Sequence, residues 1–188
     1  MKRVFWVRHG PTHRTEMNGW TDVPADLSDR ETLQRLSDFL PRAPMVSSDL
    51  TRAVATADVI QGDRPRLDHR TDLRELHFGA WEGRRFDELD ETDSALLRRY
   101  WDDPGSQRAP GGESWNDLSN RINEAADALI AKWDVIIAVA HMGVILTQVQ
   151  RATGKSAFDT LGQRISNLSV SEFVYDGIWH LERVDHHP

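Results

Sequence analysis

The sequence predicts an α/β fold: a three-layer α/β/α sandwich around a mostly parallel sheet, with a β-hairpin near the C-terminus. Short apolar runs alternate with longer segments in which apolar residues recur every three or four positions, as expected for alternating strands and helices. The run 135–140 is apolar throughout, which is typical of a strand buried on both faces. Two further segments, 166–175 and 178–185, flank the dipeptide Asp176-Gly177, a hairpin signal.

The first quarter of the chain is predicted to contain one strand, one long loop and one helix. Residues 4–7 form a buried strand that ends at Gly10, and the polar, turn-rich stretch 11–26 forms a loop. A helix begins after Ser28, which can cap it, and ends at Pro41. The apolar stripe of this helix comprises Leu33, Leu36, Phe39 and Leu40.

A second strand and helix are expected to follow. Residues 45–47 form a short strand, and Ser48 or Asp49 can cap the next helix, which ends at Gly62. Its apolar face comprises Ala53, Val54, Ala57 and Ile60. The next stretch, 66–83, shows neither a helical nor a strand period, and its glycines mark turns.

The second half contains the clearest helix. Residues 86–101 are predicted to be helical, 102–112 form a loop, and Ser114 opens a helix that leads to the strand 135–140. The apolar residues of that helix are Trp115, Leu118, Ile122, Ala125, Leu129 and Trp133. A further helix is expected over 142–152.

Length and composition exclude several classes of protein. We expect one domain over 1–188, because the chain shows no repeat or linker and is long enough for one core. A net charge of −7 disfavours nonspecific nucleic-acid binding. The absence of cysteine excludes disulfides, thiolate metal sites and a cysteine nucleophile. No apolar run approaches the ~18 residues of a membrane helix, and the N-terminal run 4–7 is shorter than the ~7–15 residues of a signal-peptide core, so we expect a cytoplasmic protein with no membrane partner.

Two histidines follow predicted buried strands. His9 lies in Arg8-His9-Gly10, directly after the first strand, and His141 comes directly after the strand 135–140. Parallel strands would place both histidines at one edge of the sheet, where α/β proteins bind ligands. Arg52 falls in the first turn of a helix, where a cation opposes the helix dipole unless an anion is held beside it.

Five sequence segments, in this order, resemble the histidine phosphatase superfamily (phosphoglycerate-mutase-like, branch 1). They are RHG at 8–10, SSDLTRAVATA at 47–57, LRELHFGAWEG at 73–83, PGGES at 110–114 and AHMGVI at 140–145. The third and fourth are most similar to those of alpha-ribazole phosphatases and general bacterial phosphatases. The last long segment, from Ser166 to Val184, resembles the terminal hairpin of bacterial members.

The resemblance implies a role for each of five residues. His9 matches the histidine that becomes phosphorylated, and Arg8 and Arg52 match the arginines that bind the phosphoryl oxygens. His141 matches the second histidine, which hydrogen-bonds the transferring group. Glu75 matches the proton donor, which later deprotonates water, and we expect bound phosphate to raise its pKa. No cofactor and no metal ion is implied, since the arginines supply the positive charge.

Two positions depart from the family pattern. Thr15 stands where many members carry an asparagine, in a loop, 11–22, that is shorter than usual, and its hydroxyl could donate to phosphate. Met142 replaces a glycine beside His141 and could form an apolar wall of the pocket. Thr15 and Met142 are therefore expected to contact the substrate.

The resemblance implies a metal-independent phosphomonoester hydrolase that acts through a phosphohistidine, and we expect its substrate to be a small phosphorylated metabolite. A phosphoglycerate-mutase-type phosphoryl transferase is the first alternative, although mutases of this family carry a longer insertion before the second histidine. The second is a non-catalytic regulator that binds a phosphorylated ligand, which the presence of all five core residues disfavours. The sequence identifies neither the natural substrate nor the oligomeric state, and a homodimer stays open.

Overall fold

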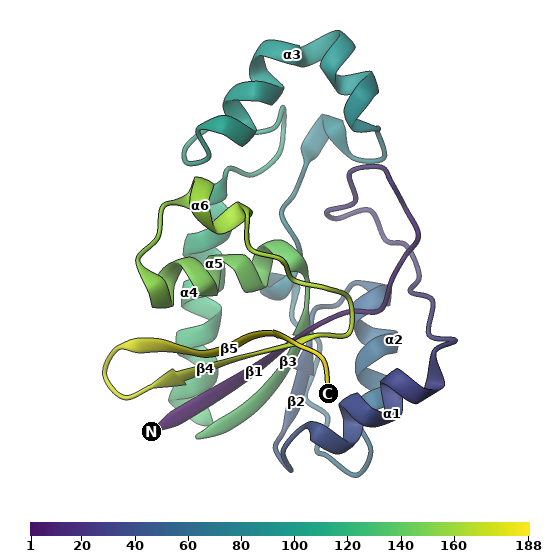
Figure 1. The fold of residues 1–188 in the computed structure, drawn as a ribbon, viewed down its shortest axis with the longest axis vertical. Helices are drawn as coiled ribbons and strands as arrows, with labels where there is room; N and C mark the ends of the chain where they lie inside the picture. Colours follow the sequence, from purple (N-terminus) through teal and green to yellow (C-terminus); the bar gives the residue numbers. More distant parts are fainter.

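A five-stranded mixed sheet forms the centre of the computed structural model, which describes all residues 1–188 (Figure 1). The strands are β1 (Lys2–Arg8), β2 (Met45–Ser47), β3 (Val135–Ala140), β4 (Val170–Tyr175) and β5 (Trp179–His186). Their order is β2-β3-β1-β4-β5. Strands β2, β3 and β1 pair in parallel, whereas β4 pairs antiparallel with both β1 and β5. The expected sheet and hairpin are therefore confirmed, with β4 as the one strand that runs opposite to the others.

Helices cover both faces of the sheet, which confirms the three layers (Figure 1). One face carries α1 (Arg30–Phe39) and α2 (Thr51–Ile60), and the other carries α4 (Trp115–Lys132) and α5 (Met142–Thr153). Alternate side chains of β1 enter the two cores: Phe5 and Val7 pack with α1 and α2, whereas Val4 and Trp6 pack with α4 and α5. No helix combines the length and apolarity that crossing a membrane requires.

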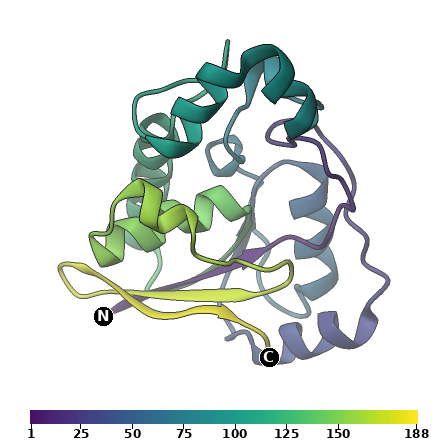
Figure 2. The same ribbon diagram turned by 45° about the horizontal axis from the view of Figure 1, so that its top comes forward.

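Two helices lie outside these layers. The helix α3 (Phe86–Asp102), which is kinked at Asp93, lies beyond the sheet on the side opposite to α1 (Figures 1 and 2). The short helix α6 (Ala157–Leu161) precedes the hairpin and was not predicted. The stretch 66–83 contains only two 3₁₀ turns, at Thr71–Leu73 and Gly79–Trp81, in agreement with its lack of periodicity.

Both predicted helix caps in the first half are wrong. Asp29, not Ser28, caps α1, because its carboxylate accepts a hydrogen bond of 3.0 Å from the backbone N–H of Thr32. Helix α2 has no side-chain cap from its own N-cap residue, and Asp22, from the loop before α1, accepts from the backbone N–H of Thr51 (2.7 Å). Asp49 cannot fill this role because its carboxylate is engaged elsewhere, in an ion pair with Arg74.

The hairpin strand is shorter than expected. It begins at Val170 rather than at 166, because the preceding residues form a turn in which Leu168 has a φ of 59°. The hydroxyl of Ser169 donates to the carbonyl of Ser166 (2.7 Å), which closes the turn. The chain between α6 and β4 is thereby bent back toward the end of β1.

Candidate active site

The parallel register of β1 and β3 brings His9 and His141 together. Arg8, the last residue of β1, lies opposite Ala140, the last of β3, so the histidines that follow project from adjacent strand ends. Their ring centroids are 5.1 Å apart, and both side chains are buried. His9 Nδ1 lies 2.7 Å from the carbonyl of Gly10, so the proton belongs on Nδ1 and Nε2 keeps its lone pair.

Both imidazoles are held in the neutral form. Burial and then the charge of Arg52 lower the pKa of His9 to about 3. Burial also lowers the pKa of His141 well below its usual range, and the neighbouring His9 adds to the effect. Neither ring nitrogen of His141 has a hydrogen-bond partner, although the side chain is fully buried. An unpaired buried imidazole is a group that a bound ligand could satisfy.

Two arginines from different elements, Arg8 of β1 and Arg52 of α2, place their charges near the histidines. Arg8 donates to the carbonyl of Ile165 (2.5 Å), and its buried Nε has no partner. Arg52, only 1% exposed, donates to the carbonyls of Thr21 (2.9 Å) and Gly19 (2.6 Å). Those carbonyls offset the unfavourable position of a cation in the first turn of α2.

The carboxylate of Glu75 is fixed by backbone N–H groups. Its Oε1 accepts from the N–H of Leu76 (2.9 Å), and its Oε2 accepts from the N–H of Gly143 (3.0 Å). Gly143 lies in the first turn of α5, where the helix dipole stabilises an anion. Burial lowers the pKa values of Arg8 and Arg52, and the negative charge of Glu75 partly counteracts this effect. The structure therefore groups the five residues for which the sequence suggested roles.

The loop before α1 depends on Glu82, which was not among the residues singled out from the sequence. Its carboxylate accepts hydrogen bonds from the backbone N–H groups of Gly19, Trp20, Thr21 and Phe78, at 2.8–3.1 Å, and from the hydroxyl of Thr21 at 2.6 Å. Burial alone would raise the pKa of Glu82, but these hydrogen bonds lower it overall. The sequence signal for Glu82 was its place in the segment 73–83, which lacks periodicity and resembles the family.

Thr15 and Met142 differ in their placement. The side chain of Thr15 is exposed, and its backbone N–H donates to Glu16 (3.2 Å), so none of its hydrogen bonds links it to the histidines. Its contact with a substrate stays a prediction. Met142 is 41% exposed and lines a groove of about 470 Å³ together with Arg8. The segment 161–167, which no sequence pattern connected with the site, forms the rest of this groove.

The chain has no cluster of side chains that could form a metal site. No three histidine, aspartate or glutamate side chains are placed so that they could hold one metal ion. The polar groups that converge on the histidines are instead guanidinium groups, backbone N–H groups and one carboxylate, as described above. Guanidinium groups and imidazoles are donors suited to phosphate oxygens.

Comparisons with known proteins assign the chain to a family. The model of the histidine phosphatase superfamily (branch 1) matches residues 4–185. A protein of Mycobacterium tuberculosis described as bifunctional is 31% identical over 93% of this chain and 51% of its own length. The chain thus spans about half the length of these mycobacterial relatives. A probable phosphoglycerate mutase, GpmB, of Salmonella paratyphi C is 28% identical over 93% of this chain and 86% of its own.

Solved structures have the same fold. YhfR of Bacillus stearothermophilus superposes with a TM-score of 0.86, at 25% identity, over 97% of this chain and 96% of its own. A mycobacterial glucosyl-3-phosphoglycerate phosphatase, solved in complex with VO3, gives 0.82 at 25% identity over 98% and 99%. A putative alpha-ribazole-5'-P phosphatase from Escherichia coli gives 0.85 at 22% identity over 99% and 97%, which shows the fold alone.

Proposed function

The chain belongs to the histidine phosphatase superfamily (branch 1), and on that basis we propose that it hydrolyses phosphomonoesters through a phosphohistidine at His9, without a metal ion. One observation carries the proposal. The hydrogen bond at Nδ1 of His9 leaves Nε2 unprotonated in buried surroundings that include the ring of His141 and the charges of Arg52 and Arg8. A neutral imidazole between cations is a nucleophile beside a binding site for its anionic target.

In the first half-reaction, Nε2 of His9 attacks the phosphorus atom as the bond to the ester oxygen breaks. Arg8 and Arg52 neutralise the charge on the phosphoryl oxygens, and His141 donates a ring N–H to one of them. Glu75, in its acid form, transfers its proton to the departing oxygen, so that an alcohol leaves rather than an alkoxide. The products are the alcohol, a phosphohistidine and the Glu75 carboxylate.

In the second half-reaction, the Glu75 carboxylate takes a proton from water, and the resulting hydroxide attacks the phosphorus atom. The bond from phosphorus to Nε2 breaks, inorganic phosphate leaves, and His9 and protonated Glu75 are regenerated. The two backbone N–H groups that bind Glu75 stabilise its carboxylate form between the half-reactions. The phosphomonoester and water are thus the only reactants, and the alcohol and inorganic phosphate are the only products.

A small phosphorylated metabolite is the substrate class that we propose. The groove beside Arg8 and Met142, of about 470 Å³, has room for a leaving group of metabolite size. The relatives include a probable phosphoglycerate mutase as well as phosphatases, so a mutase is the second candidate. The exposure of Met142 favours hydrolysis, because water can enter the groove that Met142 and Arg8 line.

The test measures phosphate release from a panel of phosphomonoesters in the presence of EDTA. Wild type and His9→Ala are compared, and each is also mixed with substrate labelled in its phosphoryl group and quenched in alkali, in which phosphohistidine survives. We expect turnover of a subset of the panel and labelled protein from wild type alone. A panel without turnover contradicts the hydrolase. Isomerisation that depends on a bisphosphate primer favours the mutase, and stable phosphate binding without turnover favours a regulator.

A further inference from the structure

Arg121 of α4 uses every N–H group of its guanidinium in hydrogen bonds. Its Nε and one Nη2 hydrogen bind the two carboxylate oxygens of Glu113, at 2.9 and 2.7 Å. Its Nη1 donates to the carbonyls of Asp72 (3.0 Å) and Arg74 (2.8 Å), and Nη2 also donates to the carbonyl of Glu75 (3.2 Å). Three of the five donors therefore connect α4 to the segment 72–75, and the other two bind Glu113.

Glu113 binds the other end of the same segment. Its carboxylate accepts from the backbone N–H of His77 (3.0 Å), and its own N–H donates to the carbonyl of His77 (2.8 Å). The Arg121 and Glu113 side chains are each 18% exposed, so their bidentate ion pair is largely shielded from solvent. The segment 72–77 is thus held by this ion pair at both its ends.

The segment needs such support because it has no regular structure of its own. Residues 74–78 lie between two 3₁₀ turns and belong to no helix or strand. Only the end residues Arg74 and Phe78 share hydrogen bonds with these turns, so residues 75–77 have no helical or sheet hydrogen bonds. The carboxylate of Glu75 is bound by backbone N–H groups and by no side chain, so its position follows from the path of its backbone. Trp20 donates to the Glu75 carbonyl as well (2.8 Å), but from another loop, whereas Arg121 comes from a helix.

We infer that Arg121, paired with Glu113, is a positioning residue that fixes the proton-donating carboxylate of Glu75. The inference rests on the proposed function, in which Glu75 protonates the leaving oxygen. Proton transfer requires hydrogen-bond distance, and a displacement of about 1 Å can cost about 100-fold in rate. Loss of the guanidinium fork should therefore impair the reactions that need the proton and spare those that do not.

The experiment compares two substrates of similar shape and different leaving-group basicity. The 4-nitrophenolate of 4-nitrophenyl phosphate leaves without protonation, whereas the alkoxide of 4-nitrobenzyl phosphate needs the acid. In Arg121→Lys, which keeps the positive charge but loses the planar fork, we expect kcat/KM for the nitrobenzyl ester to fall at least about tenfold further than for the nitrophenyl ester. Glu113→Gln removes the ion pair from the other side and should change the ratio in the same direction.

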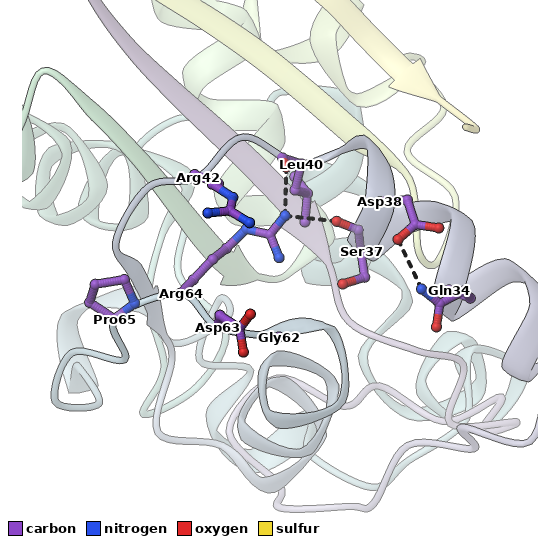
Figure 3. A pocket seen from close by; sticks show the side chains of 9 residues that line it. All are labelled: Gln34, Ser37, Asp38, Leu40, Arg42, Gly62, Asp63, Arg64 and Pro65. Atoms are coloured by element: carbon purple, nitrogen blue, oxygen red, sulfur yellow. Dashed lines mark hydrogen bonds between the residues drawn. The ribbon is translucent and has the colours of Figure 1, made fainter.

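Arg64 offers a matched control (Figure 3). It is another arginine whose guanidinium is bound to backbone carbonyls, but it lies at the C-terminal ends of α1 and α2, beside a cavity of about 500 Å³ that contains none of the active-site residues. Its acceptors are the carbonyls of Ser37, Leu40, Pro41, Ile60 and Gln61. Arg64→Lys should lower the melting temperature and leave the ratio of the two kcat/KM values unchanged.

The variants Glu75→Gln and Glu75→Gln/Arg121→Lys complete the test. We expect Glu75→Gln to raise the nitrophenyl-to-nitrobenzyl ratio, and the double variant to raise it no further. An unchanged ratio in Glu75→Gln contradicts the acid role of Glu75, and with it the proposed mechanism. A raised ratio in Glu75→Gln with an unchanged one in Arg121→Lys and Glu113→Gln overturns the positioning role alone. A ratio in the double variant above that of Glu75→Gln also overturns it, because Arg121 would then act independently of Glu75.

Discussion

The backbone N–H of Gly143 donates a hydrogen bond of 3.0 Å to Oε2 of Glu75, and the two residues fit together so closely that no side chain has room at position 143. A Cβ atom there would lie 2.4 Å from Oε1 of the same carboxylate. The contact joins the N-terminus of α5, which carries His141 as its N-cap, to the segment that carries the proposed acid. It links the two sides of the site without a side-chain ion pair.

Gly143→Ala should therefore displace Glu75. We expect a loss of about 1–3 kcal/mol in the free energy of unfolding, from overpacking, and a fall of at least about tenfold in kcat/KM for 4-nitrobenzyl phosphate. Urea denaturation and steady-state kinetics measure the two effects. Gly105→Ala is the control, because the nearest atom to its added Cβ would be 3.9 Å away. Wild-type activity in Gly143→Ala would mean that Glu75 need not occupy its present position.

The low pKa of His9 makes stability depend on pH. The pKa is about 3 in the folded chain and about 6.5 when unfolded, so between these values the unfolded state binds more protons and stability falls as pH falls. From pH 7 to pH 5, His9 alone should cost the wild type about 2 kcal/mol in the free energy of unfolding. His9→Gln should lose that much less over the same interval in urea titrations. Equal losses in the two proteins would contradict a neutral His9.

Removal of the Glu82 charge should loosen the loop that Arg52 contacts. Glu82→Gln keeps one carbonyl acceptor but loses the second carboxylate oxygen, so some of the N–H groups of Gly19, Trp20 and Thr21 lose their partner. We expect a cost of about 1–3 kcal/mol in stability. Hydrogen exchange at these three amides should become faster than in wild type.

The matched control for this variant is Glu31→Gln, which breaks an exposed ion pair with Arg35 on α1. Such pairs contribute about 0–1 kcal/mol, so stability and exchange in the loop should stay close to wild type. Unchanged exchange at residues 19–21 in Glu82→Gln would show that other contacts suffice to hold the loop.

Truncation of Met142 should weaken the binding of apolar leaving groups. Met142→Ala removes apolar surface from the groove, and burial of each methylene group is worth about 0.8 kcal/mol, so KM for 4-nitrophenyl phosphate should rise about three- to tenfold. KM for glycerol 3-phosphate, which has a polar leaving group, should change little. Ile178→Ala, at the exposed tip of the hairpin, serves as the control. Equal effects on both substrates would argue against an apolar wall at Met142.

The elements that the sequence predicted best are those with strong local signals. The strands 45–47 and 135–140 were predicted to the residue, because buried apolar runs end abruptly at polar or turn residues. The helix that Ser114 caps was also correct, since its apolar period and its capping box are both local. The pairing of His9 with His141 followed from two such strands and the general geometry of parallel sheets.

Several errors arose where a distant partner competes for a side chain. Asp49 was a candidate cap for α2, but Arg74, which is 25 residues away, binds its carboxylate with hydrogen bonds of 2.8 and 2.6 Å. Glu82 and Arg121 bind mainly backbone groups of other segments, and Glu113 binds Arg121 and one such group. No sequence pattern identifies these partners in advance. Helix α6 was missed because five residues are too few for a visible period.

The register of β1 with β3 affects the order in which the parts of the site are lost when the protein unfolds. His9 and His141 are attached to neighbouring strands of the central sheet, so their spacing persists for as long as that sheet does. Glu75 sits on an irregular segment whose connections to the rest are made by side chains and a few amides. Local opening favours such segments over core strands. Under mild denaturation, the chain should therefore lose its proton donor before its nucleophile, and pass through a state that still accepts a phosphoryl group from an activated ester.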